Sequence, residues 1–467
     1  MIPVLTPEEM GEVDRSASEP VEVLVERAGF AVAAAARDLM GGTYGRRVLV
    51  VAGPGNNGAD GRVAADRLRT WGAKVTVVDA RSIGGGDRLG FADLVVDAAY
   101  GTGLKRAYRP PDPGRAPVLA VDIPSGLSGL TGTGTSLTAR KTVTFAGYKP
   151  GLLLGEGPVA CGRVALAGIG LDRLAAARAS MWLIEDDDMA MVPTRRRDGH
   201  KWQTAVLVVG GSSAMNGAPL MVAHGAMRAG AGYALVAVPG GPEGGGLPPG
   251  EQVGVELPAG DWVPAAARAA GRVRALAVGP GLGAGARSAD GATGPDAPVG
   301  RLLRATEVPA VVDADGITAL GDVAGVRAVT SGRAGPVVLT PHEGEYAKLT
   351  GHKPAEDRIT DVRDTARQTG AVVLLKGSTT VVAGPDGQVR MAAAGGPNLA
   401  TAGTGDTLTG IITAFLARGL EPLEAAALGA HAHGRAAGRG RPEGLVASDL
   451  PDLVADYLSE MVPGSGV

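Results

Sequence analysis

Several residue types on which whole classes of function depend are scarce in this sequence. It has one cysteine, Cys161, which excludes an internal disulfide and a cluster of thiolate metal ligands. Aromatic residues make up 3% of the chain, so the stacking platforms that hold single-stranded nucleic acid are not expected. A formal net charge of −3 over 467 residues leaves no basic excess for binding nucleic acid or a membrane surface.

Long apolar segments are missing as well. The opening residues, MIPVLTPEEMGEVD, contain neither the basic start nor the apolar stretch of a secretory signal, and no apolar run is long enough to cross a bilayer. We therefore expect a cytoplasmic protein that does not bind a membrane. The length of 467 residues and the 45% content of apolar residues suffice for two or three domains with cores of their own.

The first part of the chain alternates β-branched runs with helical or glycine-rich segments. Residues 8–40 are predicted to form one or two helices, interrupted near Pro20. The predicted strands that follow are 47–52, 74–78, 94–97, 118–123 and 142–145. Alternation of this kind is typical of a parallel α/β sheet.

A second series of the same kind begins after a charged stretch. Between residues 171 and 199 the chain runs through an Ala/Arg segment, an acidic run and then PTRRR, which suits an exposed connection. We place the two domains at 1–190 and 191–467. In the second domain the predicted strands are 205–209, 234–238, 275–278, 310–313, 336–340, 371–376 and 379–382. The predicted helices are 215–228, 317–320, 343–349, 405–416 and 423–437. The predicted loops are 240–250 and 283–294.

The first motif with chemical content is GPGNNGADG at residues 53–61, between an apolar strand and a predicted helix. A glycine-rich turn at this position presents free backbone N–H groups, and the start of the helix adds a partial positive charge, so the turn suits a phosphate. An ordinary tight turn would explain the glycines alone. The asparagines and the aspartate favour a site, because their oxygens can coordinate a hard cation or bind a sugar.

Two aspartates stand at the ends of later predicted strands. Asp97 is followed by AAYGTGL, and Asp122 is followed by IPSG. Ligands of open parallel sheets bind beyond the carboxyl ends of the strands, so the three motifs can meet in one crevice. A helix cap or a turn would explain a single aspartate. Three such motifs in one domain favour a site.

The runs GPGNNGADG, VDAAYGTG, DIPSG and FAGYKPGLLLGEG make residues 1 to about 190 similar to the NAD(P)H-hydrate epimerase family. The resemblance implies a Rossmann-like fold that binds a potassium ion and a hydrated nicotinamide nucleotide. The implied potassium ligands are Asn57, Asp97 and Ser125. The residues implied to hold the hydrated nucleotide are Asn56, Asn57, Gly58, Ala59, Asp60, Gly101, Thr102, Gly103, Leu104, Lys105, Arg106, Ala107 and Asp122.

The chemistry of the hydrated nucleotide gives Asp122 its predicted role. Hydration places a hydroxyl on C6, beside the ring nitrogen, in either of two configurations. The nitrogen lone pair can help to break a bond to C6, and re-forming that bond on the other face inverts the centre. Such a route needs a positioned proton carrier, for which Asp122 is the candidate. Lys149 is a candidate second member, and a surface lysine in a glycine-rich loop is an equally good interpretation.

One position departs from the epimerase pattern. The family usually has a second glycine where this chain has Ala59. The methyl group would crowd the turn if the residue needed a positive φ.

The most specific motif of the second domain is NLATAGTGDTLTG at residues 398–410, which leads into an apolar helical segment. A GTGD turn at a helix start aims several N–H groups at one point and forms an anion hole for a phosphoryl group in transfer. Asp406 lies just inside the predicted helix, where it can accept the proton of an attacking hydroxyl. Capping would explain the aspartate but not the nearby glycines.

Further motifs follow one another in the second domain: GGS at 210–212, MNGA at 215–218, GPGLG at 279–283, DADG at 313–316, TPHEGE at 340–345 and LKGSTT at 375–380. Singly, GPGLG is a weak signal, and a histidine such as His342 is more often a helix cap or a core residue than a substrate contact. As an ordered set they resemble the ADP/ATP-dependent NAD(P)H-hydrate dehydratase family, a branch of the ribokinase-like α/β fold. The resemblance implies hydrated-cofactor contacts at Ala218, Gly281, Gly283, His342 and Asp406, and adenine-nucleotide contacts at Lys376, Gly377, Ser378, Thr379, Thr380 and Gly405.

Together the resemblances imply repair of hydrated NADH and NADPH. The first domain would interconvert the R and S forms of NADHX and NADPHX. The second would phosphorylate the C6 hydroxyl of the S form, with Asp406 as base, so that phosphate leaves in place of hydroxide. Mg²⁺ with ADP, which would give AMP and phosphate, is the implied co-substrate, and self-association is expected.

Two other interpretations stand beside this one. One is a ribokinase-like small-molecule kinase with a non-catalytic Rossmann-like companion domain. Such a kinase would use the GTGD turn in the same way, but it would form a stable phosphorylated product. A metalloenzyme is weakly supported, because His431 and His433 stand two residues apart in a predicted helix and do not share a face. Packing or surface roles are expected for these histidines.

Overall fold

The computed structural model describes residues 1–467 except 105, 196–197, 242–249, 288–290 and 463–467. The chain divides into two compact units. The smaller unit is Ile2–Met181, and the larger unit is Trp182–Val467 together with Met1. The division into compact units does not show where one activity ends and the other begins along the chain. The predicted domain boundary at residue 190 therefore stays a prediction.

The smaller unit is built on a six-stranded parallel sheet in the order β3-β2-β4-β5-β6-β7. The strands of this sheet are β2 (Arg47–Ala52), β3 (Lys74–Asp79), β4 (Leu94–Ala98), β5 (Val118–Val121), β6 (Lys141–Phe145) and β7 (Arg163–Ala167), and the short strand β1 (Ile2–Val4) is not part of it. β2, β4 and β5 are neighbours, so the segments that follow them lie at one edge of the sheet.

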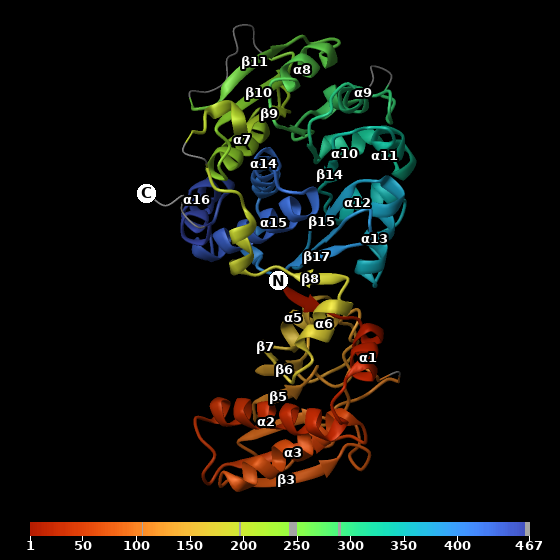
Figure 1. Ribbon diagram of the computed structural model, residues 1–467, viewed down its shortest axis with the longest axis vertical. Coiled ribbons are helices and arrows are strands. Elements are labelled where there is room, and N and C mark those ends of the chain that lie inside the picture. Colours follow the sequence, from red (N-terminus) through yellow and green to blue (C-terminus); the bar gives the residue numbers. More distant parts are fainter. Residues whose placement is uncertain (105, 196–197, 242–249, 288–290, 463–467) are drawn as a thin grey trace. The chain divides into compact units, whose positions relative to one another are not determined.

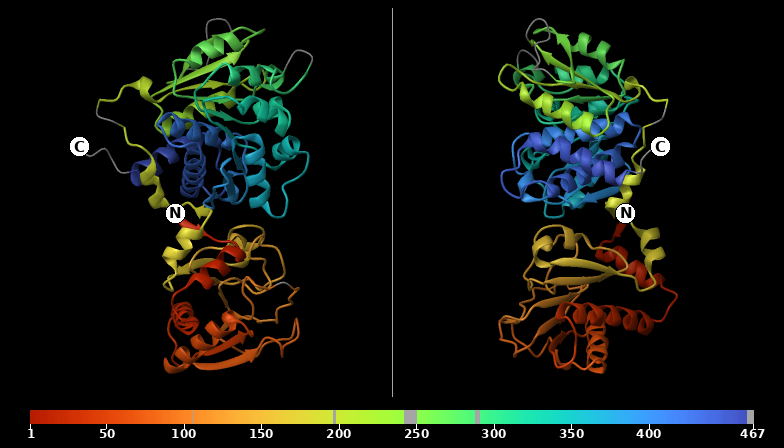
Figure 2. Two further views of the ribbon diagram at one scale, coloured as in Figure 1. Left: turned by 45° about the vertical axis from the view of Figure 1, so that its right-hand side comes forward. Right: turned by 90° about the vertical axis from the view of Figure 1, so that its left-hand side faces the viewer.

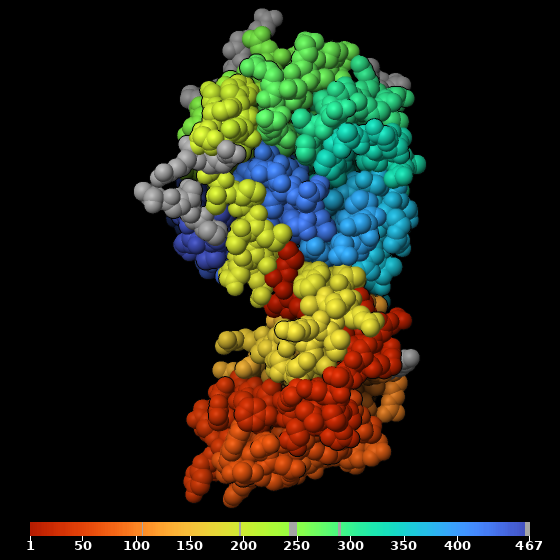
Figure 3. All heavy atoms as spheres, in the orientation of Figure 1, coloured from red at the N-terminus to blue at the C-terminus, as the bar shows by residue number. Residues whose placement is uncertain are grey.

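Helices cover the sheet of the smaller unit, and alternate side chains of each strand face opposite layers. The helices are α1 (Pro7–Ser16), α2 (Val21–Met40), α3 (Asn56–Thr70), α4 (Pro150–Leu153), α5 (Gly157–Ala160) and α6 (Asp172–Arg178). Val50 of β2 packs into the core shared with α2 and α3, whereas Val51 belongs to the core on the other face. In Figure 3 the residues of α2, in red, and the segment after it, in orange, cover one side of this unit.

The larger unit is built on a longer mixed sheet. Its strands run in the order β17-β16-β15-β14-β13-β12-β9-β10-β11, parallel from β15 to β11 and antiparallel between β15, β16 and β17. Their bounds are β9 (Ala205–Val209), β10 (Tyr233–Pro239), β11 (Val253–Leu257), β12 (Ala275–Val278), β13 (Ala310–Val312), β14 (Val337–Leu339), β15 (Val372–Leu375), β16 (Thr380–Ala383) and β17 (Val389–Ala392). β8 (Met181–Leu183) spans the division between the units.

A buried helix, α14 (Thr404–Ala417), lies at the centre of the larger unit (Figures 1 and 2). Every residue from Thr407 to Ala417 is buried, and the helix packs against α7 and α15. The other helices are α7 (Gly217–Arg228), α8 (Val263–Ala270), α9 (Pro298–Arg304), α10 (Asp315–Leu320), α11 (Val323–Thr330), α12 (Glu343–Thr350), α13 (Arg358–Thr369), α15 (Pro422–Arg439) and α16 (Leu450–Met461). Short 3₁₀ turns occur at Asp186–Met191, Lys201–Thr204, Gly283–Ala286, Pro397–Leu399 and Ala447–Asp449.

The strands predicted from the sequence are all present, those at 47–52, 205–209 and 275–278 with the predicted bounds and the others with shifted ends. The predicted strand 118–123 ends at Val121, because Asp122 has a φ of +64° that leaves the extended conformation. The predicted loop 283–294 begins with a 3₁₀ turn at Gly283–Ala286, and most of the predicted loop 240–250 lies outside the described residues. No helix in the described part of the chain is both long and apolar enough to span a membrane.

Two candidate active sites

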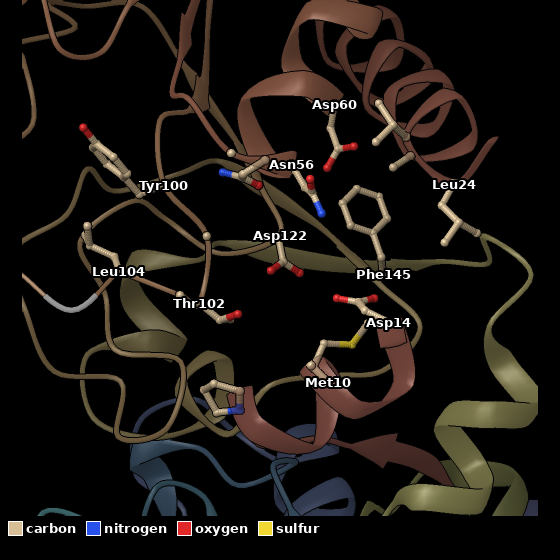
Figure 4. A pocket seen from close by; sticks show the side chains of 18 of the residues that line it. Met10, Asp14, Leu24, Asn56, Asp60, Tyr100, Thr102, Leu104, Asp122 and Phe145 are labelled. Atoms are coloured by element: carbon tan, nitrogen blue, oxygen red, sulfur yellow. The ribbon is translucent and has the colours of Figure 1, made fainter. Parts of the chain in front are cut away.

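A cavity of about 800 Å³ opens in the smaller unit at the edge where β2, β4 and β5 end (Figure 4). Its walls come from α1, α2, the start of α3, the segment after β4 and the end of β6, with Asp122 pointing into it. The sequence predicted a crevice at this edge from the motifs that follow these strands, and the structure places parts of all three motifs around one space.

The turn after β2 brings polar side chains to the cavity wall because its backbone is unusually close to its neighbours. A Cβ atom on Gly53 would lie 1.7 Å from the carbonyl oxygen of Ala99, and a Cβ on Gly58 would lie 1.9 Å from that of Gly53. Only glycine fits at these two positions. Asn56, Asn57 and Asp60 line the cavity, whereas Gly58 and Ala59 do not.

Ala59 does not crowd the turn. The residue lies inside α3 and is absent from the residues with positive φ. The crowding considered from the sequence would have required a positive φ, so the methyl group is accommodated as in any helix.

Asp97 and Ser125, two of the predicted potassium ligands, are in direct contact with each other and are buried, and they are not among the residues that line the cavity. The Ser125 hydroxyl donates to the Asp97 carboxylate at 2.5 Å, and the Ser125 backbone N–H donates to its second oxygen at 2.9 Å. Asp97 is 2% exposed, and its burial raises its pKa. The hydrogen bonds from Ser125 lower the pKa, but by less than burial raises it. The third predicted ligand, Asn57, has buried amide oxygen and nitrogen atoms that find no partner among the described residues.

Asp122 and Lys149 form a buried ion pair at the cavity floor. The Lys149 ammonium donates to the Asp122 carboxylate at 2.5 Å, to the Thr144 hydroxyl at 2.9 Å and to the Phe145 carbonyl at 3.0 Å. Lys149 is 1% exposed, which rules out the surface-lysine interpretation. The Thr144 hydroxyl also donates to Asp122 at 3.1 Å. Together with the φ of +64° at Asp122, these contacts hold the carboxylate in one orientation.

The segment after β4 forms a further wall of the cavity. Gly101, Thr102, Gly103, Leu104 and Arg106 line it, whereas Ala107 is not among the lining residues and Lys105 lies outside the described residues. The Arg106 guanidinium donates to the Tyr100 hydroxyl at 3.0 Å and lies over its ring.

Three more carboxyls line the same cavity, those of Asp14, Glu19 and Asp60, and only Asp60 was predicted from the sequence to have a role. Burial, followed by the charges of Asp122 and Asp14, raises the pKa of Asp60 to about 8. Asp14 of α1 was missed entirely. It lines the cavity with Pro7, Met10 and Gly11, which share one face of α1 by helical spacing. An acidic residue on that otherwise apolar face was the available signal.

In the larger unit, the GTGD motif forms the first turn of α14. Gly403 precedes the helix with a φ of +88°, and the Thr404 hydroxyl anchors the turn by donating to the carbonyls of Leu399 at 2.8 Å and Thr401 at 2.9 Å. Asp406 is in the first helical turn, where burial and the neighbouring charge of Asp313 raise its pKa to about 7. The turn therefore presents backbone N–H groups and a carboxyl that titrates near neutrality.

Lys376 reaches this turn from the end of β15. A Cβ on Gly405 would lie 3.4 Å from the Lys376 ammonium nitrogen, so the predicted nucleotide contacts Lys376 and Gly405 are neighbours. The ammonium donates to Asp313 at 2.7 Å, and the Thr409 hydroxyl donates to the other Asp313 oxygen at 2.7 Å. Asp313 therefore fixes the lysine beside α14, a role that the DADG motif alone did not reveal.

The rest of the predicted nucleotide segment follows Lys376 directly. Gly377, Ser378 and Thr379 connect β15 to β16, and Thr380 is the first residue of β16. The Arg358 guanidinium donates to the Lys376 carbonyl at 3.4 Å, which ties the segment to α13.

The predicted hydrated-cofactor contacts Ala218, Gly281 and Gly283 also lie together. Gly281 has a φ of +67°, and a Cβ there would be 3.1 Å from the Ala218 methyl group. The Gly283 backbone N–H donates to Asp315 at 2.8 Å. Asp315 and Asp313 flank Ala314, whose φ of +53° is rare for alanine. One strained residue therefore lies between the aspartate that holds the Gly283 turn and the aspartate that holds Lys376.

His342 caps α12. Its Nδ1 atom accepts hydrogen bonds from the backbone N–H groups of Gly344 at 2.9 Å and Glu345 at 3.3 Å. The ring is 61% exposed, and its Nε2 atom lies 3.4 Å from the Glu345 carboxylate. Helix capping is thus the structural role of His342, and its contact with a cofactor stays a prediction.

His431 and His433 are both buried in α15, which confirms the packing interpretation over a surface location. The His431 Nε2 atom lies 2.9 Å from the Asp186 carboxylate. Burial lowers the pKa of His433 to about 4. Among the described residues there is no group of three or more His, Cys, Asp or Glu side chains suited to a metal ion.

Comparison with known proteins covers both units. A family model described as NAD(P)H-hydrate dehydratase matches residues 206–460, and one described as YjeF-related protein N-terminus matches residues 21–90 and 85–151. The bifunctional NAD(P)H-hydrate repair enzyme of Moorella thermoacetica is 38% identical over 98% of this chain and 97% of its own length. The Mycobacterium tuberculosis enzyme of the same name is 39% identical over 88% of each chain. A crystal structure of Bacillus subtilis ADP/ATP-dependent NAD(P)H-hydrate dehydratase with ATP/Mg²⁺ is 26% identical over 60% of this chain and 98% of its own, with a TM-score of 0.47.

Proposed function

The chain belongs to the family of bifunctional NAD(P)H-hydrate repair enzymes, and on that basis we propose which residues carry each of its two activities. The smaller unit epimerises R- and S-NAD(P)HX at C6. The larger unit dehydrates S-NAD(P)HX to NAD(P)H and converts ADP to AMP and phosphate. The observation that carries the proposal is the pair of separate carboxyl sites, Asp122 with Lys149 in the smaller unit and Asp406 with Lys376 in the larger.

In the epimerase site, Asp122 is the group that moves a proton at the C6 hydroxyl. Its carboxylate points into the cavity, and Lys149 and Thr144 orient it by hydrogen bonds to one oxygen. The other oxygen is left for the substrate. Asn56, Asn57, Asp60, residues 101–104 and Arg106 would hold the nucleotide, and their position around the cavity supports this.

Asn57, Asp97 and Ser125 are the residues that would hold potassium. The unpartnered amide oxygen of Asn57 and the buried carboxylate of Asp97 fit a monovalent cation, since both need a partner that the described residues do not supply in full. When bound, the ion would balance the buried charge of Asp97 and support the wall against which the nucleotide phosphates lie.

In the dehydratase site, Asp406 accepts the proton of the C6 hydroxyl as that oxygen bonds to the β-phosphorus of ADP and AMP leaves. The N–H groups of the GTGD turn stabilise the charge on the transferring phosphoryl group. The ring nitrogen then expels phosphate from C6, a proton leaves C5, and the dihydronicotinamide is restored. A pKa of about 7 suits Asp406 to this role because it is a stronger base than an ordinary carboxylate.

Lys376, residues 377–380 and Gly405 would hold the nucleotide, with Ala218, Gly281, Gly283 and His342 toward the hydrated ring. Mg²⁺ would neutralise the nucleotide phosphates, held mainly by the phosphates themselves because the described residues offer no three-ligand cluster. The choice of ADP, a cytoplasmic location and self-association are part of this proposal and rest on the family resemblance.

The test is to incubate the protein with mixed R- and S-NADHX, ADP and Mg²⁺ and to follow absorbance at the reduced nicotinamide band. Recovery of NADH from both forms is expected, with recovery from the R form slowed by Asp122→Ala. Recovery limited to the S form would overturn the epimerase assignment. Formation of a stable phosphorylated product without NADH would replace the dehydratase by a small-molecule kinase.

A further inference from the structure

The cavity of the smaller unit contains a carboxyl that the proposed function leaves unused. Asp14 lies on α1, and its side chain points into the same part of the cavity as that of Asp122 (Figure 4). None of the described residues donates a hydrogen bond to its carboxyl. The nearby charges that act on it are, in order, those of Lys149, Asp122 and its own neighbour Arg15, and its pKa is raised by burial.

Of the other acidic residues of α1, Glu9 and Glu12 have structural roles and Glu8 is exposed, which sets Asp14 apart. Glu9 completes the capping box with Thr6 and accepts from Ser180, and Glu12 pairs with Arg178. Met10 and Val13 are buried in the core. The helix is thus held by its other side chains, and the Asp14 side chain is aimed at the cavity without a hydrogen bond to any other described residue.

We propose that Asp14 is a second proton carrier of the epimerisation and works from the cavity wall formed by α1, while Asp122 works from the floor. This inference rests on the proposed epimerase function. Inversion at C6 by loss and return of water needs a proton donor on one face of the ring and a proton acceptor on the other. A single carboxylate on one face cannot serve both positions in one turnover.

The step balances with the groups present and solvent water. One carboxylic acid gives its proton to the C6 hydroxyl as the C6–O bond breaks, and the nitrogen lone pair forms the C6=N bond. Water then bonds to C6 from the opposite face, its proton passes to the second carboxylate, and the electron pair returns to nitrogen. The reverse reaction exchanges the two roles. Two further acidic residues line the cavity: Asp60 lies on α3 and would stay with the nucleotide, and Glu19 is paired with Arg27.

The experiment uses the full chain without ADP, so that only R and S interconversion occurs, and follows both forms by chromatography. In ¹⁸O-labelled water each inversion by the unaltered protein should place one solvent oxygen on C6, after subtraction of the spontaneous reaction. Asp14→Asn should slow interconversion by about 100-fold or more, mainly in kcat. The rate of S-NADHX dehydration in the larger unit should stay the same. Formate should restore part of the lost rate in Asp14→Ala, which a structural role would not allow.

Glu8→Gln is the matched control, because Glu8 is an exposed acid of the same helix that does not line the cavity. Interconversion within threefold of normal in Asp14→Asn would overturn the inference, as would retention of the original oxygen in the unaltered protein. If Asp14→Asn fails to fold, the incorporation of ¹⁸O by the unaltered protein decides between the two outcomes. No interconversion by the unaltered protein would overturn the epimerase function and this inference together.

Discussion

The two sites use the same pair of residue types in opposite ways. In the smaller unit, Lys149 is bonded directly to the proposed proton carrier Asp122 and is withdrawn from solvent. In the larger unit, Lys376 is bonded to Asp313, remains 22% exposed, and leaves Asp406 free to titrate near pH 7. Epimerisation transfers no phosphoryl group and binds no second anion for chemistry, so a lysine can be used purely to orient a carboxylate. Phosphoryl transfer must also bind an anion, so its lysine is held by a different acid.

The largest expected effect of breaking this division is at Asp406. Asp406→Asn should lower S-NADHX dehydration by about 10²–10⁴-fold, because the amide cannot accept the proton of the C6 hydroxyl. R and S interconversion should be unaffected, since its residues belong to the smaller unit. Both rates can be measured on one preparation, with Glu421→Gln, an exposed acid at the start of α15, as control. Equal loss of both activities would contradict the division of labour.

Removing the buried lysine should affect folding as well as rate. Lys149→Met leaves the Asp122 charge without its partner, and loss of one partner of a buried pair costs about 3–5 kcal/mol. Denaturant unfolding should show this loss of free energy, together with slower interconversion. The double variant Lys149→Met with Asp122→Asn should regain stability but not rate. Lys74→Met, at an exposed position on β3, is the control, and an equal loss of stability there would refute the explanation.

The charge of Asp313 should affect how the dehydration rate depends on pH. The proposed base works only when unprotonated, so the dehydration rate of the unaltered protein should rise as pH passes about 7, the pKa of Asp406. Asp313→Asn removes a charge that raises this pKa and keeps Lys376, which lowers it. The midpoint of the rate profile should therefore move to lower pH. An unchanged or higher midpoint would show that Asp313 does not act on Asp406, and Asp296→Asn, a surface change, should leave the profile unaltered.

The smallest effect is expected at Ala59. Ala59→Gly restores the residue usual in the family, but Ala59 is already helical and unstrained. Both rates should stay within about twofold, and the free energy of unfolding should fall by about 0.5–1 kcal/mol because glycine is a poorer helix former. A faster epimerase would show that the methyl group does crowd the site.

The sequence predicted the sheets well where strands are apolar and end in a motif. The strands at 47–52 and 275–278 match β2 and β12 because each contains an unbroken apolar run that is preceded by arginine and followed by glycine. It missed β7, β11 and β17, which carry charged residues or glycine and lack a continuous buried run, and it missed the three-residue strands β1 and β8. The α/β class and the two family resemblances are confirmed by the comparisons.

Sequence motifs located side chains next to turns but not those brought in from far along the chain. Asp122 and Asp406 follow glycine-rich or strand-end signals, so they could be named. Asp14 reaches the cavity from a helix that precedes the sheet, and the pairing of Asp313 with Lys376 joins residues 63 positions apart. Such contacts are fixed by packing of whole elements, which no local pattern records.

The strained backbone at Ala314 has a consequence for how the larger unit can change over time. Its neighbours Asp313 and Asp315 support the lysine beside α14 and the Gly283 turn, respectively. Substitutions that relax this residue would shift both supports together. Selection for a different phosphoryl donor and selection for a different acceptor therefore both act on residues 313–315. The specificities for donor and acceptor are expected to change together rather than one at a time.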